Sequence, residues 1–143
     1  MVPKGLRFAL AFSLAATSSA MEAQDAKAML GVWRGTSLCA NREVTPACKD
    51  EEVVYEFRET SPPAAGKLTM AADKIVNGER QPMGELDFVW DPKAGAWVCE
   101  IHSRYHGLWS FAPPKDGELA GTLVLLPEKT VVRKAAAKRA KTP

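Results

Sequence analysis

The sequence predicts an all-β domain: an eight-stranded antiparallel up-and-down barrel that follows a short N-terminal helix. Two observations lead to this fold class. After residue 30, short runs of alternating apolar and polar residues recur, and an alternation of period two is typical of half-buried strands. Pro, Gly and Asn-Gly signals separate these runs at near-regular intervals, and no long helical periodicity interrupts them.

The chain divides into three parts: a signal peptide over 1–20, a barrel domain over 21–137 and a basic tail over 138–143. Lys4 and Arg7 precede an uncharged apolar run that ends in small residues, so we expect cleavage after Ala20, with Ala23 as the second choice. The run is shorter than the roughly 20 apolar residues that cross a bilayer. An uncleaved N-terminal anchor is the alternative. We therefore expect a periplasmic or secreted protein without stable membrane insertion after cleavage.

Turn signals set the bounds of each expected element. The helix is expected over 24–30, with Asp25 near its positive end and Gly31 ending it. The two prolines of the loop 60–66 cannot donate backbone hydrogen bonds to a neighbouring strand. Asn77-Gly78 suits a two-residue hairpin turn, in which both residues have positive φ. The expected strands are 32–39, 52–59, 67–76, 84–91, 96–103, 107–112, 118–126 and 130–137.

Strand number and turn length favour closure of this sheet. Tight turns make consecutive strands antiparallel neighbours. Eight strands close around an interior that side chains fill or that holds one small ligand, whereas an open sheet would expose two long edges. A β-sandwich remains the alternative, because strand number alone does not prove closure.

Charge argues against a nucleic-acid partner. Five basic side chains and no acidic one occur from Arg133 to the end of the sequence, and this leaves the body of the mature chain acidic. An exported domain with an acidic body is a poor match for DNA or RNA. A solvated C-terminal end is the simplest interpretation of the basic tail.

Three cysteines are present. Cys39 and Cys48 flank a polar segment and can form a disulfide, which would stabilise the fold by about 2.5–3 kcal/mol. Cys99 shares one face of its strand with Trp97 and Ile101, so we expect a buried free thiol. Pairing of Cys99 with either of the other cysteines stays open.

No catalytic or metal centre is predicted, and no cofactor is expected. Cys99, His102 and His106 have the spacing of a ligand set, but Cys99 and His102 point to opposite faces of a strand, and a turn is expected between the histidines. An axial histidine for haem is conceivable, although nothing selects it. Ser103 faces away from the adjacent His102, and no nucleophile elbow occurs. The sequence therefore favours a protein that is not an enzyme.

Leu30-Gly31-Val32-Trp33, after a short helix, resembles the Gly-x-Trp start of the lipocalins and their calycin relatives. The resemblance implies a lipocalin-like barrel in which Trp33 plugs one end and an arginine near the last strand packs across its ring. Arg133 is the candidate for that arginine. Such a contact contributes about 0.5–2 kcal/mol.

We therefore expect an exported, non-catalytic binding protein that holds a small apolar ligand. An equally simple interpretation is that the large inward residues only fill the core. Tyr105, His106 and Trp109 are candidates for a polar contact to the ligand. The expected lining comprises Tyr55, Phe57, Met70, Leu86, Phe88, Trp97 and Ile101, together with Leu68 and Leu123.

The alternative is a protein-binding module, such as a periplasmic protease inhibitor. Small inhibitors of this kind have lipocalin-like barrels with one disulfide near the start, and this chain is similar to them in size and in its Cys39/Cys48 pair. Their inhibitory segment would correspond to residues 21–27. Either a small apolar ligand or a secreted protein is then the expected partner.

Overall fold

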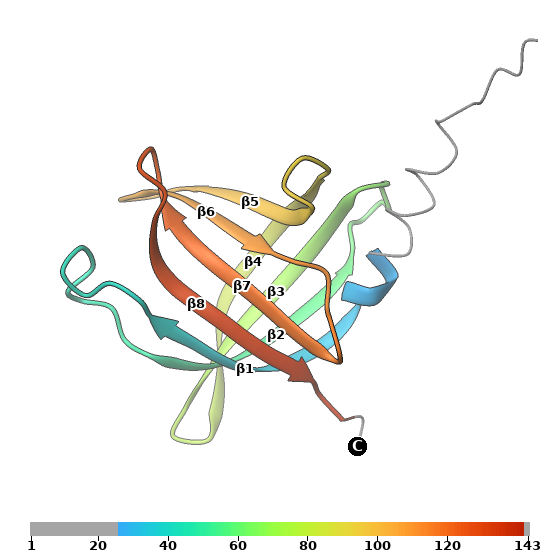
Figure 1. The fold of residues 1–143 in the computed structure, drawn as a ribbon. Helices are drawn as coiled ribbons and strands as arrows, with labels where there is room; N and C mark the ends of the chain where they lie inside the picture. The colour runs from blue at the N-terminus through green and yellow to red at the C-terminus, as the bar shows by residue number, and fades with distance from the viewer. Residues whose placement is uncertain (1–25, 142–143) are drawn as a thin grey trace, which may run out of the picture.

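A computed structural model describes residues 26–141, which form one closed barrel of eight antiparallel strands in sequence order (Figure 1). Each strand pairs with the next along the chain, and β1 also pairs with β8. The predicted fold class is confirmed, and the sandwich alternative is wrong. The strands are β1 Gly31–Cys39, β2 Glu51–Glu59, β3 Lys67–Val76, β4 Glu79–Asp91, β5 Ala96–His102, β6 His106–Phe111, β7 Glu118–Leu125 and β8 Thr130–Arg139.

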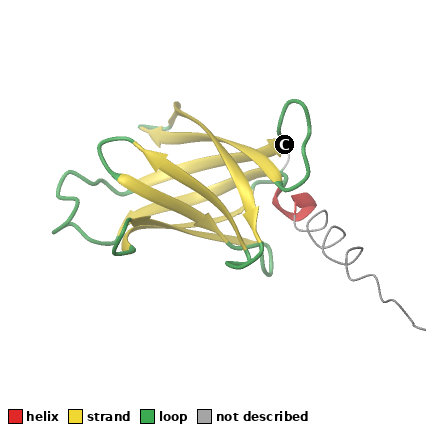
Figure 2. Ribbon diagram, turned by 90° about the horizontal axis from the view of Figure 1, so that it is seen from above, coloured by secondary structure: helices red, strands yellow, loops and turns green. Residues whose placement is uncertain are grey.

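One helical turn, residues 26–29, precedes β1 and lies at one end of the barrel (Figure 2). The expected signal peptide over 1–20 lies outside the described residues, as do residues 21–25 and 142–143. Among the described residues, no helix is long and apolar enough to span a membrane.

Two strands, β4 and β8, extend more than one residue beyond their predicted bounds. β4 begins at Glu79 instead of residue 84, because the Asn77-Gly78 turn leads directly into pairing with β3, and a register shift after Ala72 accommodates Pro82. β8 runs to Arg139, two residues into the segment that the sequence assigns to the basic tail. Pairing with β1 accounts for this extension, because Ala135 and Ala137 provide the small inward side chains that the closing strand needs.

Aromatic rings fill the half of the barrel interior nearer the helix. Phe111 is at the centre of the cluster, with its ring centroid 5.7 Å from that of Tyr55, 5.5 Å from Phe57 and 5.6 Å from Phe88, all edge to face. Such pairs contribute about 0.5–1.5 kcal/mol each beyond the burial of their area. Phe57, Phe88, Phe111 and Trp97 are essentially inaccessible to solvent. We call this cluster of Phe57, Phe88, Trp97 and Phe111 the floor.

Trp33 closes the same end, beside the helix. Its side chain is 0% exposed, and its indole Nε1 donates a hydrogen bond to the Met29 carbonyl at 2.9 Å. The guanidinium carbon of Arg139 lies 4.3 Å from the indole ring centroid. The same guanidinium donates to the carbonyls of Leu30, at 2.6 Å, and Ala28, at 2.8 Å. Arg139 thus joins the last strand to the helix and to the start of the first strand.

The prediction that Arg133 packs over Trp33 is therefore wrong. In the β1–β8 register, Trp33 is opposite Arg139, whereas Arg133 is opposite Cys39 near the other end of the barrel. The two arginines share a face of β8 because they are an even number of residues apart. No signal in the sequence indicates that β8 continues far enough to bring Arg139 over Trp33.

Replacing Arg139 by alanine is expected to lower the free energy of unfolding by about 1–2 kcal/mol, because a partly solvated cation–π contact and two charged hydrogen bonds are lost. Arg139→Lys should restore part of the lost free energy of unfolding, because the lysine ammonium keeps the positive charge but lacks the planar guanidinium group. Urea unfolding measures the difference. Lys138→Ala is the control, because Lys138 is exposed and makes only a surface ion pair with Glu118. Equal stability of the Arg139→Ala and Lys138→Ala variants would contradict the prediction.

Candidate functional site

The end of the barrel away from the helix is hollowed. The loops β1–β2, β3–β4, β5–β6 and β7–β8 surround this end, and the teal β1–β2 loop extends away from the blue helix (Figure 1). A hollow of about 450 Å³ lies between that loop and the inner faces of β5 to β8, and a second of about 270 Å³ lies deeper, towards β2, β3 and β4. Leu123 and Arg133 line both hollows, so the two adjoin. We call the combined space the cup.

Five of the nine side chains expected to line a ligand site border the cup. Tyr55, Met70 and Leu86 border the deeper hollow, and Ile101 borders the larger one. Leu123, also expected, borders both.

Three expected lining residues, Phe57, Phe88 and Trp97, belong instead to the floor. Leu68 is fully buried in the same core. These four do not line the cup, because the floor rings meet one another edge to face and leave no room between them. The interior is therefore filled at one end and hollow at the other.

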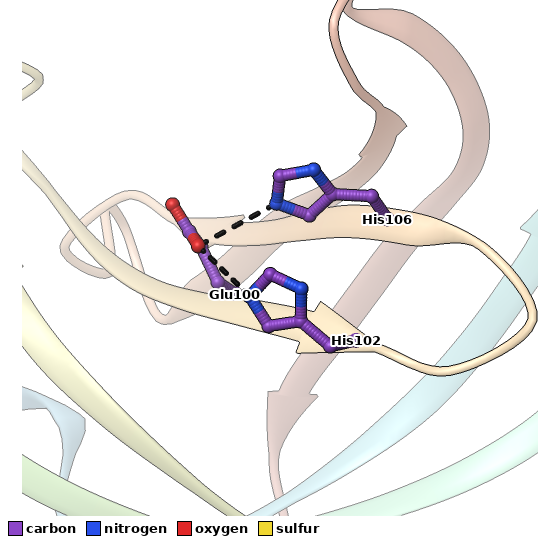
Figure 3. A group of neighbouring side chains, drawn as sticks. All are labelled: Glu100, His102 and His106. Atoms are coloured by element: carbon purple, nitrogen blue, oxygen red, sulfur yellow. Dashed lines mark hydrogen bonds and ion pairs between the residues drawn. The ribbon is translucent and has the colours of Figure 1, made fainter.

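Of the three residues considered for a polar contact, two border the cup and one does not. Tyr105 lines the larger hollow and Trp109 the deeper one. His106 lies outside, on the outer face of the β5–β6 hairpin (Figure 3).

Arg133 provides a charged group on the wall of the cup. Its Nη1 donates to the Ser37 hydroxyl at 3.0 Å and to the Ser37 carbonyl at 3.2 Å, and its Nη2 donates to the Lys49 carbonyl at 2.9 Å. A Glu51 carboxylate oxygen lies 3.7 Å from Nη1, and the side chains of Arg133 and Glu51 are only 18% and 24% exposed. Arg133 therefore fastens β8 to β1 and to the segment before β2. Side chains alternate between the two faces along β8, so Arg133 points inward if Ala135 and Ala137 do. This alternation is the sequence signal that could have placed Arg133 inside the barrel.

Tyr55 lies beside this polar wall. Burial raises the pKa of Tyr55 to about 12, and the hydrogen bond to Ser37 and the charge of Arg133 only partly oppose that rise. The phenol is thus neutral near pH 7. Ser37 is itself 2% exposed, so the cup contains a buried hydroxyl pair next to a guanidinium.

The predicted disulfide between Cys39 and Cys48 is confirmed, and it closes the loop that covers the larger hollow. Asp50 holds the loop further, because its carboxylate accepts the Cys39 backbone N–H at 2.8 Å. That bond, together with the charge of Arg42, keeps the pKa of Asp50 below its usual value. The loop is therefore a fixed wall of the cup.

The prediction for Cys99 is also confirmed: it is a buried, free cysteine. Burial raises the pKa of the Cys99 thiol, and the negative charge of Asp87 adds to that effect. A thiol held in its protonated form is a weak nucleophile, so Cys99 acts as a small core residue.

Comparisons of the chain with protein-family models, with curated proteins and with solved structures find no match. The closed antiparallel barrel is consistent with a lipocalin-like fold.

Ionisation of Tyr55 is expected to weaken the fold only in strongly alkaline solution. An unfolded tyrosine loses its proton near pH 10, whereas folded Tyr55 keeps it to about pH 12. The stabilisation is complete below pH 10 and is lost as the pH rises towards 12, with a slope of up to about 1.4 kcal/mol per pH unit. Urea unfolding between pH 10 and pH 12 should show that the free energy of unfolding falls less steeply with pH in Tyr55→Phe than in wild type. The same decline in both proteins would contradict the assignment.

Proposed function

We propose that the protein is a non-catalytic binding protein whose cup holds one small, largely apolar molecule with a polar group. The observation that carries this proposal is the pair of adjoining hollows of about 450 and 270 Å³ above the floor. Ligand pockets in proteins commonly measure about 300–1,000 Å³ and combine apolar walls with a few fixed polar groups. The calycin-like start of the sequence supports the same role.

The walls of the cup suit an amphipathic molecule. Met70, Leu86 and Trp109 present apolar surface in the deeper hollow, opposite the Ser37 and Arg133 wall. An apolar body would lie against the first set and a hydrogen-bonding group would meet the second. Glu51 offsets much of the charge of Arg133, so a neutral polar group fits this wall as well as an anion does.

The rim of the cup supports entry of an apolar ligand. Leu38, Val44, Val76, Met83 and Tyr105 are large apolar side chains that are exposed, and all lie on the strand ends or loops around the open end. Among the described residues, the other exposed large apolar side chain is Val89, which lies far from this rim on β4. An apolar rim lowers the cost of moving such a ligand from water into the cup.

The absence of an enzymatic role and the export of the protein are part of the same proposal. Tyr55 is neutral at pH 7, and Arg133 is held by three carbonyl or hydroxyl acceptors, so neither suits proton transfer there. The Cys39–Cys48 disulfide agrees with an oxidising compartment, as does the signal-like start of the chain. Residues 21–25 of the segment assigned to protease inhibition lie outside the described residues.

Filling the cup is expected to abolish ligand binding. Leu123 borders both hollows, so Leu123→Trp should occupy the space where they join and weaken binding of the apolar probe 1-anilinonaphthalene-8-sulfonate at least about tenfold. Fluorescence titration near neutral pH measures the affinity, and circular dichroism checks the fold. Val89→Trp is the control, because it adds the same ring outside the cup.

Native mass spectrometry of freshly purified protein gives a second readout. A bound mass that is present in wild type and absent from Leu123→Trp would support carriage of a ligand. Saturable probe binding that is equal in wild type and Leu123→Trp would contradict it. If wild type neither carries a mass nor binds the probe, the protein-binding alternative becomes the better account.

A further inference from the structure

The outer face of the β5–β6 hairpin gathers both histidines of the chain beside a carboxylate. Glu100 and His102 are two residues apart on β5, so their side chains point to the same side of the sheet. His106 begins β6 and pairs directly with His102. Figure 3 shows the three side chains converging, with a nitrogen of each imidazole turned towards the Glu100 carboxylate. The hairpin register places the three residues side by side.

The distances among these atoms match those within a coordination sphere. One Glu100 oxygen, Oε2, lies 3.2 Å from Nε2 of His102 and 3.5 Å from Nε2 of His106. Two ligands of a tetrahedral Zn²⁺, each at about 2.0 Å from the ion, lie about 3.3 Å apart. One ligand atom from each residue lies within 4.8 Å of the other two. A small shortening of the longest of these separations therefore brings all three ligand atoms to one ion.

We propose that Glu100, His102 and His106 bind a divalent transition-metal ion, with Zn²⁺ as the natural occupant and water in the remaining position. Two imidazole nitrogens and one carboxylate oxygen are a ligand set that Zn²⁺ accepts with an open fourth site. The ion would replace the present contacts of the carboxylate with the two rings by three bonds to itself.

The side chains have the freedom to make this adjustment. The imidazole rings are stacked, with centroids 4.5 Å apart and planes 22° apart, so they must rotate slightly to direct both lone pairs at one ion. The side chains of His102, Glu100 and His106 are 68%, 57% and 45% exposed, so rotation meets little resistance and water reaches the open position.

Cys99 is not part of this site. It lies on the inward face of β5, buried, with its sulfur 3.6 Å from the Glu100 carbonyl. Of the three residues in the sequence pattern Cys99, His102 and His106, Cys99 therefore points to the opposite face of the sheet from the site. Glu100, which is not in that pattern, points to the same face as His102. The site is also separate from the cup, because Ile101, between Glu100 and His102, points inward and lines the cup, whereas Glu100 and His102 point outward.

Zinc affinity of tag-free protein near neutral pH tests the proposal, by competition with a chromophoric chelator. We expect one Zn²⁺ per chain, and at least about tenfold weaker binding after His102→Ala or His106→Ala, with a smaller loss after Glu100→Gln. Cys99→Ala and Glu56→Gln are controls and should bind as wild type does, since the first removes the free thiol and the second an exposed glutamate on β2.

Thermal unfolding provides the second measurement. An ion that binds only the folded chain raises the melting temperature, so Zn²⁺ should stabilise wild type and Cys99→Ala but not His102→Gln or His106→Gln. Circular dichroism of the ion-free variants confirms that they fold. No saturable binding to wild type would overturn the proposal, as would affinity unchanged by the histidine variants or abolished by Cys99→Ala.

Discussion

The pairing of β1 with β8 is the constraint on which the rest of the structure depends, because it converts a meander of hairpins into a closed barrel without free edges. At Gly35 this pairing requires a residue without a side chain. A Cβ on Gly35 would lie 1.9 Å from the Ala136 carbonyl oxygen, so the strands approach more closely there than any side chain allows. The same pairing brings Arg139 over Trp33 at one end of the seam. At the other end it brings Arg133 to Ser37.

Closure divides the interior into two halves with different contents. Large rings such as Phe57, Phe88 and Phe111 meet at the helix end and exclude any ligand. Towards the other end, Met70, Leu86 and the Arg133 guanidinium line the wall together with Tyr55 and Trp109, and the barrel stays partly empty. Eight strands enclose a space that closely packed side chains just fill, so the barrel is solid where the floor rings meet and hollow beyond them.

The β5–β6 hairpin contributes to two separate surfaces through the alternation of its side chains. Ile101 points inward to the cup, while Glu100 and His102 point outward to the proposed zinc site. The turn residues Ser103 to Tyr105 also border the larger hollow. A metal ion that joins β5 to β6 would therefore stiffen one wall of the cup without touching its contents.

Alternation and turn signals in the sequence were enough to predict the number and order of the strands, the Cys39–Cys48 bond and the burial of Cys99, because these depend on neighbours close along the chain. They were not enough to choose between Arg133 and Arg139 as the partner of Trp33, since that choice depends on the register between strands about a hundred residues apart. The cup and the Glu100, His102 and His106 cluster likewise required tertiary structure. The alternation of side chains along a strand predicts which way each one points. Only the pairing of β5 with β6 across their turn shows which side chains meet.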